Sequence, residues 1–244
     1  MPSIFFRLAL LAAGLAVIST SRAQTPATPT AAGLKKNFAL IEAGTEGESE
    51  SFDKLTTATA RQLVAYLKTH EMTAKAAKSM GLDYTDSKGD ARFKVFTYSY
   101  SSGGTRGTIH RPVFQWKNAA GQLFAYSSAE ECYFSEIHQL ASPGRTLYLL
   151  LGGDKGDGQC DNNEAYVVEL KGNYLLVDKA AFGKKPLLRL CNVPMTFDAS
   201  KQLLQLDLTD YSTEHDETLP PEWERPRAKS LTLKFNGGRF VQSR

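Results

Sequence analysis

A strand–loop–strand pattern between Thr146 and Leu170 gives the first indication of the fold. Residues 147–151 (LYLLL) are apolar at every position, which is typical of a β-strand covered on both faces. Residues 165–170 (AYVVEL) carry the β-branched and aromatic side chains that strands favour. The loop between the two segments is rich in glycine and acidic residues. We therefore predict a hairpin at the centre of a mostly antiparallel sheet.

Further short strands are expected on both sides of this hairpin, because apolar alternation and turn residues recur about every ten residues. Such spacing is typical of an antiparallel meander that forms a sandwich, a barrel or a partial propeller. The expected strands are 93–100, 109–116, 123–127, 132–140, 174–178, 187–191, 195–198, 203–209, 230–236 and 239–242.

Two helices are expected before the strands. Apolar residues recur at helical spacing over residues 55–69 and form one stripe. A second helix over residues 73–80 would end at Gly81, a residue suited to the left-handed position that follows a helix. The predicted fold class is mostly β with N-terminal helices (α+β). The predicted single globular domain covers residues 52–244, with helices in 52–82 and antiparallel strands in 92–244.

The N-terminus resembles a secretory signal peptide over residues 1–23. Arg7 supplies a positive charge, and residues 8–18 (LALLAAGLAVI) form an apolar core. Ser21 and Ala23 are the small residues that a cleavage site after Ala23 requires. The apolar run is too short for a comfortable membrane span. Export to the periplasm or secretion is therefore expected, with no membrane span after signal cleavage.

Residues 24–51 are expected to form a flexible linker. The first part, 24–36, is rich in Thr, Pro and Ala, and residues 45–51 (TEGESES) are acidic and polar. Segments of such composition bury too little apolar surface to offset the entropy of ordering the chain.

The overall charge argues against a nucleic-acid-binding protein. The chain carries a formal net charge of +3, and removal of the signal segment with its two arginines would lower it to +1. A nucleic-acid binder is expected to display a basic stripe. We therefore expect no nucleic-acid partner.

Three cysteines follow the signal segment, and one disulfide is expected in an oxidising compartment. Paired residues in an antiparallel hairpin have a nearly constant sum of residue numbers. This rule places Cys132 and Cys160 at the same end of the central strand, and it places Cys191 near Tyr174 at the opposite end. The register therefore predicts a disulfide between Cys132 and Cys160, with Cys191 as a buried free thiol.

Several strand-and-turn segments resemble exported, uncharacterised β-rich proteins of Bacteroidota-type bacteria. These segments are residues 93–100 (FKVFTYSY), 102–105 (SGGT), 113–116 (VFQW) and 231–240 (LTLKFNGGRF). The resemblance covers about residues 82–244 and implies a periplasmic or secreted setting. Its motifs are structural, so it implies no functional residue.

The acidic loop raises the possibility of a calcium site. Asp154, Asp157, Asp161 and Glu164 are closely spaced, as oxygen ligands to calcium often are. Gly and Lys occupy the two alternate positions before Asp157, where further ligands would be needed. A plain hairpin loop is the favoured interpretation, and a calcium-stabilised module is an alternative.

Three residues could carry acid–base chemistry. Glu136 and His138 lie two residues apart, so both point to one face of a strand. A buried carboxylate beside an imidazole could perform acid–base work, whereas a structural or solvent-exposed pair could not. His110 is a further candidate without a partner in the sequence.

Aromatic residues suggest a binding surface for a glycan or a peptide. The candidates lie in predicted strands, where aromatic residues are more often part of the core, and they are Tyr98, Tyr100, Phe114, Trp116, Phe124 and Tyr126. Trp223 lies in a long charged segment, residues 210–229, which is either a solvated loop or a binding loop.

The sequence contains no catalytic, phosphate-binding or dinucleotide-binding motif. The favoured interpretation is an exported, non-enzymatic binding or structural module without a cofactor, whose partner is a glycan or a protein of the cell envelope. The alternative is a glycan or cell-wall hydrolase that uses Glu136 and His138.

Overall fold

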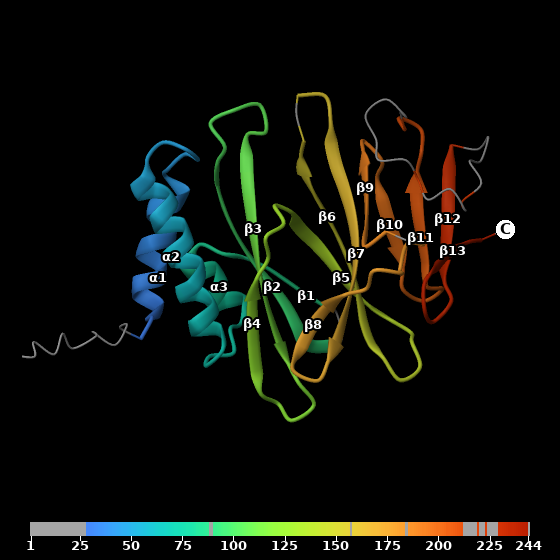
Figure 1. Cartoon of the computed structure of the whole chain (residues 1–244), viewed down its shortest axis with the longest axis horizontal. Helices are drawn as coiled ribbons and strands as arrows, with labels where there is room; N and C mark the ends of the chain where they lie inside the picture. Colours follow the sequence, from blue (N-terminus) through green and yellow to red (C-terminus); the bar gives the residue numbers. More distant parts are fainter. Residues whose placement is uncertain are drawn as a thin grey trace, which may run out of the picture.

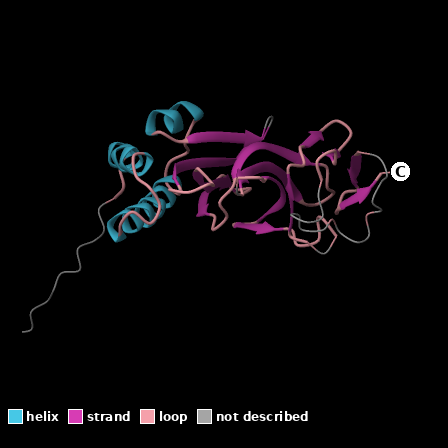
Figure 2. Ribbon diagram, turned by 90° about the horizontal axis from the view of Figure 1, so that it is seen from above, coloured by secondary structure: helices cyan, strands magenta, loops and turns pink. Residues whose placement is uncertain are grey.

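The computed structural model describes residues 28–87, 90–156, 158–183, 185–211, 219, 223 and 229–243. Three helices lie at one end of the molecule, a strongly curled sheet lies in the middle, and a small second sheet lies at the other end (Figures 1 and 2). The curled sheet forms a half-barrel, so the α+β class predicted from the sequence is confirmed. No helix in the described ranges is long and apolar enough to cross a membrane.

Each helix begins at a residue whose side chain caps it. The hydroxyls of Thr30, Ser49 and Thr73 accept hydrogen bonds from backbone N–H groups of the first turns. Gly81 follows the last helix with φ of 84°, the left-handed conformation that glycine adopts without strain. The helices are α1 (Ala31–Glu42), α2 (Glu50–Leu67) and α3 (Ala74–Met80).

Helix α1 corrects the prediction of a flexible linker over residues 24–51. Its residues Leu34, Phe38 and Ile41 are spaced four and three apart, so they lie on one face, and all three are buried. The polar residues on both sides of residues 31–42 masked the helical spacing of these three side chains, which pack in the apolar cluster beneath the helices. The N-terminal residues up to 27, including the predicted signal peptide, lie outside the described part of the chain.

The large sheet has nine strands in the order β4-β3-β2-β1-β5-β6-β7-β8, with β9 also paired to β7. Neighbouring strands are antiparallel except at β1 and β5, which meet in parallel at Ser87 and Ile137. Its strands are β1 (Asp83–Ser87), β2 (Asp90–Ser101), β3 (Thr108–Lys117), β4 (Leu123–Ser127), β5 (Tyr133–Leu140), β6 (Thr146–Lys155), β7 (Asp161–Lys171), β8 (Tyr174–Val177) and β9 (Leu187–Cys191).

The small sheet is a four-stranded antiparallel meander that covers the outer face of β6, β7 and β9. Its inward residues, such as Leu204, Leu206 and Leu233, pack with Leu149 and Val167 in one apolar cluster. The strands are β10 (Met195–Asp198), β11 (Leu203–Asp207), β12 (Ser230–Phe235) and β13 (Phe240–Gln242).

Three apolar clusters hold these layers together. The first lies between β6, β7 and the small sheet, and the second lies between the helices and the outer face of β2, β3 and β4. The third covers the inner face of the curled sheet and is rich in aromatic residues, including Phe93, Phe114, Phe134 and Tyr148. The helices and the small sheet thus cover the two ends of the outer face. The inner face packs against itself and also lines a pocket.

Candidate functional site

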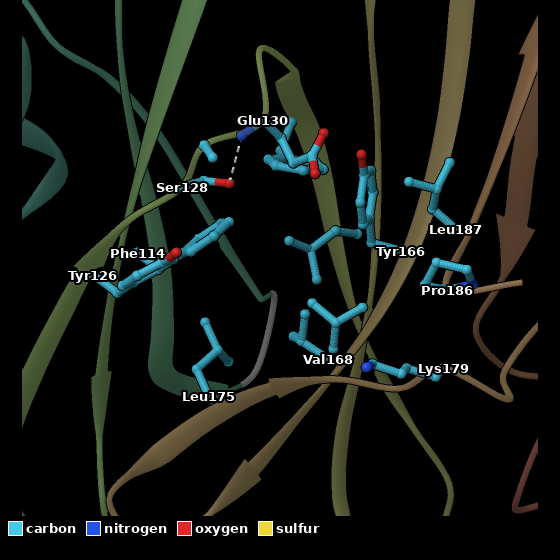
Figure 3. A pocket seen from close by; sticks show the side chains of 14 residues that line it. Phe114, Tyr126, Ser128, Glu130, Tyr166, Val168, Leu175, Lys179, Pro186 and Leu187 are labelled. Carbon is cyan, nitrogen blue, oxygen red and sulfur yellow. Dashed lines mark hydrogen bonds between the residues drawn. The ribbon is translucent and has the colours of Figure 1, made fainter.

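A pocket of about 300 Å³ opens on the inner face of the half-barrel, between β3–β4 on one side and β7–β8 on the other (Figure 3). Phe114 and Tyr126 form one side of it, and Tyr166, Val168 and Leu187 form the other. The remaining lining residues are Ser128, Ala129, Glu130, Phe134, Leu150, Leu175, Val177, Lys179 and Pro186.

Strand alternation explains why these residues meet. Phe114 and Tyr126 are paired across β3 and β4, so they project to the same face. On β7, Tyr166 and Val168 project inward, whereas Val167 between them packs outward against the small sheet. The apolar stretches 147–151 of β6 and 165–168 of β7 can therefore face a core on one side and a pocket on the other.

Polar groups gather at the edge of the pocket. Ser128 Oγ accepts a hydrogen bond of 3.0 Å from the backbone N–H of Glu130 (Figure 3). The Glu130 carboxylate lies 3.6 Å from the guanidinium of Arg189. Lys179, from the segment after β8, forms no ion pair with any described residue. The pocket is therefore mostly apolar, and its lining includes one acidic side chain and one cationic side chain that has no ion-pair partner among the described residues.

The buried Glu164 carboxylate lies close to Tyr166, which lines the pocket. Glu164, two residues before Tyr166, is fully buried, and its carboxylate accepts a hydrogen bond of 2.5 Å from Arg189. Burial, together with the negative charge of Glu164, raises the pKa of the Tyr166 hydroxyl. The same two effects raise the pKa of the buried Cys132 thiol. Both groups therefore stay protonated at neutral pH, and Cys132 is a poor nucleophile.

The disulfide joins Cys160 to Cys191, with their Cα atoms 5.2 Å apart, and Cys132 is a buried free thiol. The predicted pair Cys132–Cys160 is therefore wrong. The error lies in the position of β9. Instead of following β8, it pairs with the beginning of β7, which places Cys191 opposite Asn162. Two short strands, β8 and β9, thus share one edge of the long strand β7.

The calcium candidates do not come together as a ligand set. Asp154 and Asp161 lie in strands rather than in a loop, and Asp154 pairs with Arg106 at 2.9 Å. Glu164 is engaged by Arg189, and Asp157 lies outside the described residues. Within the described ranges, no group of three or more metal-ligating side chains is close enough to hold an ion.

Strands β6 and β7 extend into the Gly-rich segment because the backbone of β6 approaches the backbones of β5 and β7 closely at two glycines. A side chain at Gly152 would collide with the carbonyl oxygen of Tyr133, and one at Gly153 with that of Asn162. These glycines therefore allow β6 to pass tightly between β5 and β7, and they shorten the connection that the sequence suggested.

Glu136 and His138 contact each other but do not form a pocket. His138 Nε2 lies 2.7 Å from the Glu136 carboxylate, whose side chain is 52% exposed. The imidazole ring packs on Phe197 of the small sheet, with ring centroids 5.0 Å apart. Neither residue lines the candidate pocket. The Glu136–His138 pair therefore has the geometry of the structural, solvent-exposed alternative rather than that of a buried acid–base pair.

His110 is half-buried near the start of β3. Its Nδ1 lies 2.8 Å from Ser99 Oγ on β2, and its ring packs on Tyr133. Burial lowers the pKa of this imidazole, so it is neutral at pH 7.

The aromatic candidates divide between core and cavity. Trp116 belongs to the inner cluster and Trp223 to the cluster under the small sheet, and each is 5% exposed. Tyr98 and Tyr100 project to the outer face, where they line a second cavity beneath α2. Phe114 and Tyr126, which the sequence also indicated as members of an aromatic surface, line the inner pocket, whereas Leu175 and Val177 of that pocket were not predicted as site residues.

Comparisons of the chain with protein-family models, with curated proteins and with solved structures find no match. The functional interpretation therefore depends on the geometry of the two cavities.

Proposed function

We propose that the protein is an exported binding protein that holds the apolar part of a small ligand in the inner pocket. The observation that carries this proposal is the pocket itself, a space of about 300 Å³ whose lining is mostly apolar and includes only a few polar side chains, among them Glu130 and Lys179. Ligand pockets are typically concave and mostly apolar, with a few polar groups that fix orientation. The volume corresponds to roughly ten groups of about 30 Å³ each, the share of one water molecule in the liquid.

Two features support an extracellular or periplasmic setting. The N-terminal sequence has the charged, apolar and small-residue regions of a signal peptide. The Cys160–Cys191 disulfide is compatible with an oxidising compartment, where such bonds persist. The resemblance to exported proteins of Bacteroidota-type bacteria points to the same setting.

The hydrolase and calcium alternatives receive less support from the geometry. Glu136 is half-exposed and does not line the pocket, and the carboxylates of Asp154 and Glu164 are engaged by arginines. A binding role uses the pocket as it stands and requires no additional group.

The proposal can be tested with N-phenyl-1-naphthylamine, an apolar probe whose fluorescence increases on transfer out of water. Val177 lines the pocket and is 48% exposed, so Val177→Arg can fold while placing a charge at the pocket entrance. Leu176 is 43% exposed but does not line the pocket, so Leu176→Arg is a matched control on the same strand.

We expect the wild-type protein and Leu176→Arg to bind the probe with similar affinity. We expect Val177→Arg to weaken binding at least tenfold, because the probe would have to desolvate a guanidinium. Equal binding by all three proteins would place the probe elsewhere and overturn the proposal, as would an absence of binding by the folded wild-type protein.

A further inference from the structure

A second cavity of about 500 Å³ lies on the outer face of the half-barrel, beneath helix α2. The side chains of Thr57, Ala60, Arg61 and Val64 reach it from α2, because residues three and four apart share one face of a helix. Tyr98, Tyr100 and Arg111 reach it from β2 and β3. Ser127 and Ser128, at the end of β4, complete its lining together with Thr56.

The chemistry of this cavity differs from that of the inner pocket. Six of its ten lining residues carry a hydroxyl, two carry a guanidinium, and none of them is acidic. A hydroxyl both donates and accepts hydrogen bonds, whereas a guanidinium only donates and matches the planar oxygens of a carboxylate or phosphate. Such a lining suits a molecule that is hydroxylated and negatively charged.

One of the two cations is held in place and the other is unpaired. Arg111 donates from Nε to the Tyr100 hydroxyl at 3.0 Å, and its Nη2 lies 2.8 Å from a Glu131 carboxylate oxygen and 3.8 Å from one of Glu46. The Arg111 guanidinium is thus fixed at the edge of β3, which preserves its orientation before any ligand arrives. Arg61 is exposed and forms no ion pair with a described residue, so it is available to a ligand.

We propose that this outer cavity binds the oxyanion of a sugar acid or a sugar phosphate, with Arg61 and Arg111 contacting the oxyanion and the hydroxyl-bearing residues contacting the ring. Tyr98 and Tyr100 add aromatic surface at the base of the cavity, which suits the apolar face of a sugar ring. This site is separate from the inner pocket, and the two cavities share only Ser128 among their lining residues in the described structure.

The test uses amide chemical-shift mapping with three probes, namely D-glucuronate, D-glucose 6-phosphate and neutral D-glucose. We expect at least one of the charged sugars to shift amides of α2, β2 and the end of β4 at millimolar concentration, and glucose to bind at least fivefold more weakly. The charged sugar that binds more tightly identifies the oxyanion as a carboxylate or a phosphate.

Two arginine variants separate a specific contact from general attraction. Arg61→Gln should weaken binding of the charged sugar about fivefold, the effect of losing one partly exposed ion pair. Arg239→Gln removes the same charge from an exposed residue outside the cavity and should leave binding unchanged. Equal binding of glucose and the charged sugars, equal effects of the two variants, or no shifts at all would each overturn the proposal.

The variant Val177→Arg keeps the two sites distinguishable. It alters the inner pocket alone, so charged-sugar binding should be unchanged in it. Loss of sugar binding in Val177→Arg, with the fold intact, would contradict a separate outer site even if the inner pocket holds its apolar probe.

Discussion

Arg189 on β9 lies directly opposite Glu164 on β7, and its guanidinium Nε is 2.5 Å from a carboxylate that is fully buried. The Arg189 side chain is 36% exposed and also reaches Glu130 at the mouth of the inner pocket. Arg189 therefore links the buried carboxylate of Glu164 to Glu130, which lines the inner pocket. The ion pair also joins β9 to β7, next to the disulfide between Cys191 of β9 and Cys160, which directly precedes β7.

Because Glu164 is buried and Arg189 is partly exposed, replacing Arg189 and replacing Glu164 should lower the free energy of unfolding by different amounts. In Arg189→Gln, the buried Glu164 carboxylate would lose its cation, which should lower the free energy of unfolding by about 3 kcal/mol. In Glu164→Gln, Arg189 keeps water and Glu130, so the loss should be about 1 kcal/mol. Urea unfolding followed by circular dichroism measures both values. The double variant should lose less than the sum, and strict additivity would show that the two residues do not interact.

Helix α1 leads to a second prediction. Phe38 is 3% exposed and packs on Tyr98, with ring centroids 5.4 Å apart. Phe38→Ala should therefore lower the free energy of unfolding by about 3 to 5 kcal/mol, the range for truncating a buried aromatic residue. Leu40→Ala is the control, because Leu40 is 51% exposed on the same helix and should change stability by less than about 0.5 kcal/mol. Similar small losses in both variants would restore the picture of a flexible linker.

The helices and most strands could be predicted because their patterns are local. Helix α2 and strand β6 each show the apolar pattern of their element, and the structure has both, although α2 begins five residues before the predicted start at residue 55 and β6 continues four residues beyond residue 151. Helix α1 could not, because the Thr- and Pro-rich residues before it lowered the apolar content of the window. Its docking depends on Tyr98, which lies far away in the sequence.

The two cavities were harder to predict because they depend on how the sheet curls. The pairing of β9 with β7 brings Leu187 to the inner pocket and Cys191 to Cys160, and no local pattern specifies that pairing. The sequence did single out Tyr98 and Tyr100 as binding candidates, and both line the outer cavity. Arg61 was not identified, since a charged helix residue is usually solvated.

The disulfide gives a third prediction. Cys160 and Cys191 are 31 residues apart, so loss of their bond should lower the free energy of unfolding by about 4 kcal/mol on the chain-entropy model. Cys191→Ser tests this by chemical denaturation under non-reducing conditions. Peptide mapping should yield a linked Cys160–Cys191 peptide, and Cys132 should react with an alkylating reagent only after unfolding because it is buried. A peptide that links Cys132 to either partner would contradict the observed pairing.

His110 predicts how stability depends on pH. Burial lowers its pKa below the ordinary 6.5, and Arg106 opposes its protonation while Asp154 and Asp83 favour it. Between the folded pKa and 6.5, the unfolded chain therefore binds more protons than the folded one, so the contribution of His110 to stability rises with pH through this window and is constant below and above it.

The variant His110→Gln should reduce this slope, because glutamine does not titrate and can keep a hydrogen bond to Ser99. Denaturant midpoints measured from pH 5 to pH 8 for wild type, His110→Gln and His70→Gln provide the comparison. His70 is exposed just after α2, so its variant controls for the loss of an imidazole without the loss of a buried one. An unchanged slope in His110→Gln would mean that other groups cause the pH dependence, and a slope that falls equally in both variants would remove the role assigned to burial.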